Sequence, residues 1–216
     1  MKATSKLVGS LVCAVAFLFA ASQVSAANVL TNPGFEDAGG SLNGWSLSGL
    51  SGLSTVTALA GDNGPSAPGT HYAFMDNSSG AALGLTLKQS SAAGSAGPGL
   101  VNWSFDLGFS SAAAGGVFFV EIFAEKAGGG VIGGSGLLGN FTDGAWTAHS
   151  GSFVAPALTD FLTIQFEANT APIGGSTSRM RVDNVNLSPT VVPEPTTVSL
   201  VGLGLIGLLG LRRRKA

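Results

Sequence analysis

The chain of 216 residues carries ten lysines and arginines against twelve aspartates and glutamates, and only 10% of its residues are charged. Residues 27–190, between two apolar terminal segments, hold four basic residues against eleven acidic ones, a net charge of −7. So few basic residues argue against nucleic acid as a partner, because phosphate contacts need clustered lysine and arginine. The only cysteine, Cys13, precedes this region, which excludes a disulfide, a thiolate metal site and a cysteine nucleophile from it.

The first 26 residues have the pattern of a secretory signal peptide. Lys2 and Lys6 form a basic start, residues 7–21 form a short apolar run, and Val24-Ser25-Ala26 offers the small residues that signal peptidase requires. We therefore expect an exported protein that signal peptidase cleaves after Ala26.

Residues 27–190 have the pattern of one all-β domain. No segment repeats apolar residues every 3.6 positions, whereas short β-type runs are bounded by Gly, Pro, Asn or Asp. Ten short strands with turns between them favour an antiparallel β-sandwich. The Gly-rich stretches 128–130 and 133–134 are expected to be turns or loops. The predicted strands are 28–30, 45–47, 54–58, 71–76, 83–88, 101–109, 117–124, 146–153, 161–167 and 180–187.

Three of these runs alternate apolar and polar residues, and each alternation predicts one buried face. In the last run, Asp183 is expected to share the buried face near the start of the strand. The residues predicted to face inward are Val101, Trp103, Phe105, Leu107 and Phe109 in the first run, Leu162, Ile164 and Phe166 in the second, and Val185 and Leu187 in the third.

The two ends of this domain resemble the galactose-binding-like jelly roll, which is the fold of several carbohydrate-binding module families. The opening reads Asn28-Val29-Leu30-Thr31-Asn32-Pro33-Gly34-Phe35-Glu36 and is followed by Gly44-Trp45. The closing strand reads Val182-Asp183-Asn184-Val185-Asn186-Leu187. The detailed motifs cover only these two ends, but the resemblance implies a jelly roll for the whole domain.

The resemblance also implies a structural calcium ion. Family members hold Ca²⁺ with the equivalent glutamate and aspartate and with carbonyl groups of a loop, so Glu36, Asp183 and the carbonyl of Thr70 are the candidate ligands. Ca²⁺ takes six to eight oxygen ligands, which suits this set. The alternative is that Glu36 caps a turn and Asp183 binds backbone amides nearby.

Two aromatic residues are the candidates for sugar contacts, since aromatic rings offer a large apolar face to a sugar. Trp146 follows the turn Thr142-Asp143-Gly144 and is the tryptophan freest to face solvent. Tyr72, between His71 and Ala73, is the second candidate. Trp45 and Trp103 are expected in the core.

An enzyme is the disfavoured alternative. The only two histidines, His71 and His149, lie in no nucleophile elbow, so a Ser-His-Asp triad is not indicated. Glu121 and Glu125 share a face only if their strand is unbroken, and nothing else supports a glycosidase pair. A secreted hydrolase therefore remains the second alternative.

The C-terminal tail, residues 191–216, has three parts in a fixed order. Pro193-Glu194-Pro195 is followed by an apolar run from Val198 to Leu211 and then by Arg212, Arg213, Arg214 and Lys215. This order resembles the PEP-CTERM sorting signal of Gram-negative bacteria. The resemblance implies a transmembrane-type helix with its basic end in the cytoplasm, and an exosortase that recognises the tail and processes the protein near Pro193-Glu194-Pro195.

Together these features predict an exported protein of the cell envelope or extracellular matrix, anchored in the inner membrane before processing. We expect a structural or adhesive component that binds exopolysaccharide. The first alternative is a calcium-stabilised structural module with no ligand of its own.

Overall fold

Ten antiparallel strands in two layers make up the part of the chain that the computed structural model describes, residues 27–50, 54–61, 64–67, 69–78, 84–139 and 144–190. These residues belong to one compact unit, Ser25–Thr190. The predicted signal peptide and sorting helix lie outside the described residues. Within the described ranges, no helix is long and apolar enough to cross a membrane.

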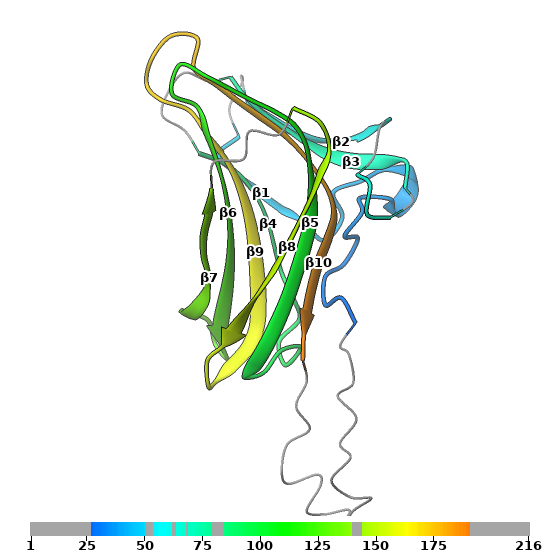
Figure 1. Ribbon diagram of the computed structural model, residues 1–216, viewed down its shortest axis with the longest axis vertical. Helices are drawn as coiled ribbons and strands as arrows, with labels where there is room; N and C mark the ends of the chain where they lie inside the picture. The colour runs from blue at the N-terminus through cyan, green and yellow to red at the C-terminus, as the bar shows by residue number, and fades with distance from the viewer. Residues whose placement is uncertain are drawn as a thin grey trace, which may run out of the picture. The chain divides into compact units, whose positions relative to one another are not determined.

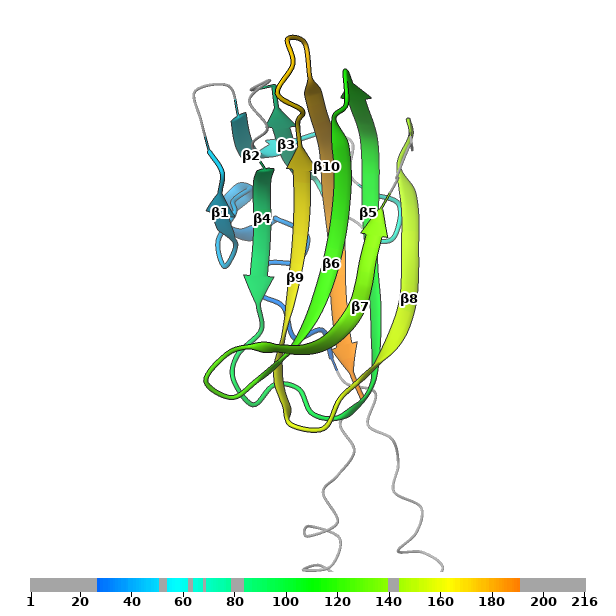
Figure 2. The ribbon, with the colours of Figure 1, turned by 90° about the vertical axis from the view of Figure 1, so that its left-hand side faces the viewer.

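Each layer is a five-stranded sheet, and we name each after its central strand (Figures 1 and 2). The β9 sheet has the order β1-β4-β9-β6-β7, and Figure 2 shows it in front. The β10 sheet has the order β2-β3-β10-β5-β8. A short 3₁₀ turn, Asp37–Gly39, precedes the first strand. The strands are β1 (Ser46–Ser48), β2 (Ser54–Ala60), β3 (His71–Asn77), β4 (Gly84–Ser90), β5 (Gly99–Ala113), β6 (Val117–Lys126), β7 (Val131–Gly139), β8 (Thr147–Ala155), β9 (Thr159–Asn169) and β10 (Thr177–Pro189).

The core lies between the inner faces of the two sheets. The predicted inward residues of β9, Leu162, Ile164 and Phe166, are all fully buried, which confirms the alternation. Phe166 joins the layers through an edge-to-face contact with Phe105 of β5, with ring centroids 5.5 Å apart. Trp45 is buried as predicted and lies 6.2 Å from the Phe166 ring.

Strand β5 follows its predicted alternation with one addition. Val101, Phe105 and Leu107 are buried, and Trp103 is partly buried against the core and stacks on Phe105 at 5.3 Å. Asp106 is also fully buried, on the opposite face of the strand. The fifth predicted inward side chain, that of residue 109, lies outside the described side chains.

A β-bulge in β10 overturns the predicted position of Asp183. Asp183 pairs with Asp106, and the next regular pair is Asn186 with Ser104, so β10 has one extra residue here. Asn184 takes a left-handed conformation, with φ 50°, at this point. The extra residue reverses the alternation, so Asp183 lies on the outer face with Asp106 while Val185 and Leu187 face the core.

Two of the expected elements differ from the structure. Residues 28–30 form no strand; Val29 donates one backbone bond to the Leu187 carbonyl and the Asn28 side chain binds β10 beside it. Conversely, β7 occupies a segment that was expected to hold loops, because its glycines permit close contact with β6. A Cβ on Gly134 would lie 2.0 Å from the Ile122 carbonyl oxygen.

Candidate functional site

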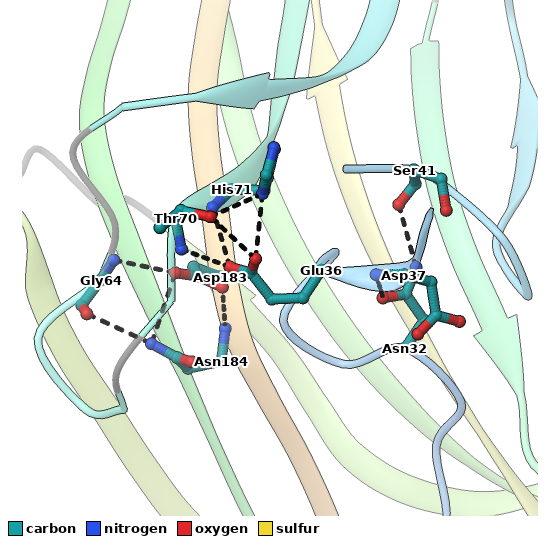
Figure 3. A network of polar contacts seen from close by, with 9 residues as sticks. All are labelled: Asn32, Glu36, Asp37, Ser41, Gly64, Thr70, His71, Asp183 and Asn184. Atoms are coloured by element: carbon teal, nitrogen blue, oxygen red, sulfur yellow. Dashed lines mark hydrogen bonds and ion pairs between the residues drawn. The ribbon is translucent and has the colours of Figure 1, made fainter. Parts of the chain in front are cut away.

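The opening motif folds into a loop that presents Glu36 to the β10 sheet (Figure 3). The Asn32 side chain holds this loop, because its oxygen accepts from the Asp37 amide and its nitrogen donates to the Ser41 carbonyl, at 3.0 and 2.9 Å. Trp45 donates from Nε1 to the Asn32 carbonyl at 3.1 Å. Asn32 and Phe35 both have positive φ, so the loop makes the tight turns that carry the chain to Glu36.

The Glu36 carboxylate binds the start of β3. Its Oε1 accepts from the amides of Thr70 and His71 at 2.5 and 2.8 Å, and its Oε2 accepts from the Thr70 hydroxyl and contacts His71 Nδ1 at 2.9 Å. Partial burial alone would raise the pKa of Glu36, but the bonds from His71 and Thr70 outweigh it and lower this pKa to about 2. Glu36 is therefore an anion over the whole physiological pH range.

Asp183 lies next to Glu36 and against Gly64 (Figure 3). Its Oδ2 accepts from the Gly64 amide at 2.9 Å and its Oδ1 from the Asn184 amide at 2.7 Å. Burial, together with the negative charges of Asp106 and Glu36, outweighs these bonds and raises the pKa of Asp183 to about 6.

Asp106 completes this acidic cluster, which we define as Glu36, Asp106 and Asp183. Its carboxylate accepts from the amide and hydroxyl of Ser66 at 2.8 and 2.5 Å, and from the Asn184 side chain at 2.9 Å. A Cβ on Gly64 would lie 2.3 Å from Asp106 Oδ2, so only glycine lets the covering segment approach so closely.

The structure thus brings together all three predicted calcium ligands, because Thr70 bonds Glu36 and Glu36 lies close to Asp183. The Thr70 carbonyl accepts from the Gly61 amide at 3.0 Å, which leaves one lone pair for a cation. Carboxylate and carbonyl oxygens are the kinds of ligand that Ca²⁺ takes, but no group of three His, Cys, Asp or Glu side chains in the described ranges is close enough to hold a metal ion.

The two predicted sugar-contact residues meet on the outer face of the β10 sheet. Tyr72 at the start of β3 and Trp146 just before β8 form an edge-to-face pair, with ring centroids 5.6 Å apart and an angle of 80°. The Arg181 guanidinium lies over both rings, 4.9 Å from the Trp146 centroid and 5.6 Å from the Tyr72 centroid. We call these three residues the aromatic–arginine cluster.

Glycine on β5 makes room for this cluster. Gly108 pairs with Arg181 across the sheet, and a Cβ on Gly108 would lie 2.7 Å from the Trp146 ring. The indole therefore lies directly on the strand. Any larger residue at this position would lift Trp146 away from Arg181.

On the other sheet, β6 runs unbroken, so Glu121 and Glu125 share its outer face as the hydrolase alternative requires. Glu125 accepts from the Thr163 hydroxyl at 2.5 Å, and Glu167 of β9 accepts from the amide groups of Gln165 and Asn169. Hydrogen bonds thus hold Glu125 and Glu167 in the sheet surface.

Sequence reasoning missed two members of these sites, Asp106 and Arg181. The signal for Asp106 was an acidic residue between two buried positions of a strongly alternating strand. The signal for Arg181 was the small number of arginines, because residues 27–190 contain only two and both lie in β10.

Comparison with protein families decides the nature of the tail. Residues 191–215 match the model of the PEP-CTERM protein-sorting motif. The protein carries a PEP-CTERM sorting signal. This PEP-CTERM segment includes the predicted residues Pro193, Glu194, Pro195, Arg212, Arg213 and Arg214, which lie outside the described residues. No curated protein matches the chain.

The domain that precedes the PEP-CTERM signal is similar in fold to solved β-sandwiches of carbohydrate-binding modules. A structure described as carbohydrate-binding modules from the β-sandwich superfamily matches 78% of this chain and 63% of its own, with 18% identity and a TM-score of 0.52. The xylanase 10B CBM22-1-GH10 modules of Clostridium thermocellum match with 16% identity and a TM-score of 0.51 over 78% of this chain. These likenesses show the fold and confirm the predicted jelly-roll sandwich.

Some structural neighbours are parts of enzymes. The enzymatically active domain of tailspike protein 4 from bacteriophage CBA120 matches 74% of this chain with 14% identity and a TM-score of 0.58. The chain spans 21% of that tailspike chain and 29% of the xylanase chain. The likeness therefore covers a minor part of each enzyme.

Proposed function

We propose that this protein is exported, sorted by an exosortase through its PEP-CTERM signal, and binds exopolysaccharide in the cell envelope or extracellular matrix. Its role there is structural or adhesive. The observation that carries the glycan-binding part is the aromatic–arginine cluster, in which two rings 74 positions apart in the sequence meet on one sheet face. That cluster lies on the fold that carbohydrate-binding modules use.

Physical chemistry supports this assignment. A sugar ring has an apolar face of C–H groups, which an aromatic side chain covers while the hydroxyl groups stay hydrogen-bonded. Tyr72 and Trp146 are each partly exposed, so part of this cluster lies at the protein surface. The edge-to-face contact holds the two rings in place before a ligand binds, which limits the entropy lost on binding.

The glycan-binding proposal predicts a loss of affinity in Trp146→Ala. We expect its Kd for the exopolysaccharide of the producing bacterium to rise by about tenfold or more, which corresponds to about 1.4 kcal/mol. Affinity electrophoresis of the purified exported protein measures this. Leu137→Ala is the matched control, since Leu137 is 58% exposed on β7 of the other sheet. Equal binding by both variants and the unchanged protein would place the glycan elsewhere.

We also propose that Ca²⁺ stabilises the domain at the acidic cluster, held by Glu36, Asp183 and the Thr70 carbonyl. Glu36 comes from the opening loop, Thr70 from the segment before β3 and Asp183 from β10. A cation there would tie the first residues of the domain to its last strand. The support is the negative charge of the cluster. Among the described residues, only His71 forms an ion pair with any of the three carboxylates, and it does so with Glu36.

The sorting part of the proposal predicts that the tripeptide is needed for processing. Replacing Pro193, Glu194 and Pro195 with alanine is expected to leave full-length protein in the inner membrane, because an exosortase no longer recognises the tail. Cell fractionation and immunoblotting show this. Alanine at Thr196 and Thr197 serves as the control, and normal release of the tripeptide variant would refute the role of the motif.

A further inference from the structure

We infer that the aromatic–arginine cluster is a site for a carboxylated sugar, a uronate unit within a polysaccharide, with Arg181 binding the carboxylate. This inference rests on the glycan-binding function proposed above and names its ligand class.

The two rings form adjacent walls around the guanidinium. Arg181 lies over the Trp146 ring at 4.9 Å and over the Tyr72 ring at 5.6 Å, and the two ring planes meet at 80°. The planar guanidinium offers its donors in a fixed fork that matches a carboxylate. A sugar that stacks on one wall would bring an attached carboxylate to this fork.

Two buried donors in the cluster have no acceptor within the described part of the chain. These are Arg181 Nε and Trp146 Nε1, both shielded from solvent. Burying an N–H group without an acceptor is unfavourable, so such groups need an explanation. The guanidinium thus has no internal acceptor at its Nε, and a carboxylate is the strongest acceptor for a guanidinium.

The other arginine of the domain shows what a paired guanidinium does on the same strand. Arg179 lies two residues before Arg181 in β10 and donates from Nε to Asp76 Oδ1 at 2.9 Å and from its terminal nitrogen to Ser78 at 3.2 Å. Arg181 has no ion pair with any described residue. The β10 sheet thus neutralises one arginine internally and leaves the charge of the other for a partner.

The surrounding charges limit the kind of anion. Asp183 lies two residues after Arg181 on β10, and Asp106 lies two residues before Gly108 on β5, so two carboxylates face the same side of the sheet. A densely charged polyanion would place further carboxylates against these acids. One unpaired cation beside an acidic cluster suits an isolated uronate in an otherwise neutral chain.

The experiment compares glucuronoxylan, a neutral backbone with sparse uronate branches, with the same polysaccharide after chemical reduction of its carboxyl groups. The purified exported protein is titrated with each by calorimetry. We expect the unreduced form to bind about tenfold tighter or better, with the difference shrinking at high salt. Equal affinity for both forms overturns the inference and leaves glycan binding intact. Failure to bind either form also overturns the inference. If the protein fails to bind the bacterium's own polysaccharide as well, the proposed function itself is refuted.

Two variants assign the effect to the guanidinium fork. Arg181→Lys keeps the charge but loses the planar fork, and it is expected to lose most of the preference for the unreduced form. Arg179→Lys is the matched control on the same strand and is expected to keep that preference. Melting curves verify the fold of both, and the comparison of the two polysaccharides on the unchanged protein stands even if a variant is unstable. A preference that survives in Arg181→Lys rules out Arg181 as the carboxylate contact.

Discussion

Replacing Phe166 with alanine is expected to lower the free energy of unfolding by about 3–5 kcal/mol. Phe166 is fully buried at the centre of the β9 sheet and contacts rings from two other parts of the fold, Phe105 on β5 and Trp45 in the opening loop. Its removal leaves a cavity between the two layers that rigid sheets cannot close. Urea unfolding of the purified exported protein measures the loss.

Two further variants test whether that loss comes from the cavity. Phe166→Leu keeps most of the volume and is expected to cost clearly less than the alanine variant. Val154→Ala removes an apolar side chain that is 73% exposed, and its effect is expected to stay within about 0.5 kcal/mol. A Phe166→Ala variant as stable as Val154→Ala would contradict the core described here.

Stability is expected to depend on pH through Asp183 when calcium is chelated. Burial, with the charges of Asp106 and Glu36, raises the pKa of Asp183 from 3.8 to about 6 in the folded state. The folded protein therefore binds the proton more tightly, and the stability that this contributes is fully present below about pH 4 and lost as the pH rises through 6. Relative to Asp183→Asn, the chelated protein is expected to lose up to roughly 3 kcal/mol of unfolding free energy between pH 4 and 7, at about 1.4 kcal/mol per pKa unit.

Calcium is expected to restore the stability that the chelated protein loses at pH 7. Ca²⁺ binds the ionised carboxylate of the folded state, so saturating Ca²⁺ at pH 7 is expected to raise the melting temperature of the unchanged protein and to leave Asp183→Asn unaffected. Asp37→Asn is the matched control, since Asp37 is exposed beside the opening loop. Identical melting curves in calcium and in chelator would refute calcium binding at the acidic cluster. The same pH dependence of stability in Asp183→Asn and the unchanged protein would refute the raised pKa of Asp183.

The alternation of apolar and polar residues made most of the strands predictable. It did not predict β7, which is rich in glycine. The pattern of β9 places Leu162, Ile164 and Phe166 on one face, so its buried side followed directly from the sequence. Strand β7 has four glycines in nine residues and shows no such pattern. Its existence depends on pairing with the edge of β6 and on backbone contacts that only glycine allows, which are tertiary properties.

The candidate sites were predictable in residue type but not in arrangement. Glu36 and Asp183 came from the motifs at the domain ends, and the structure brings them together. The face that Asp183 occupies depends on one extra residue in β10, which alternation cannot reveal. The meeting of Tyr72 with Trp146 likewise depends on the register of β3, β10 and β5 and on Gly108 beneath the indole.

The central position of β10 constrains the order in which the domain can fold. All five strands of the β9 sheet precede β10 in the chain, as do the hairpin of β2 with β3 and the pair of β5 with β8. A polypeptide made from its N-terminus therefore has every other strand before residues 177–189 join the two halves of the β10 sheet. Until then the apolar inner side of the nascent β9 sheet has an incomplete cover, which makes this stage of biogenesis vulnerable to aggregation.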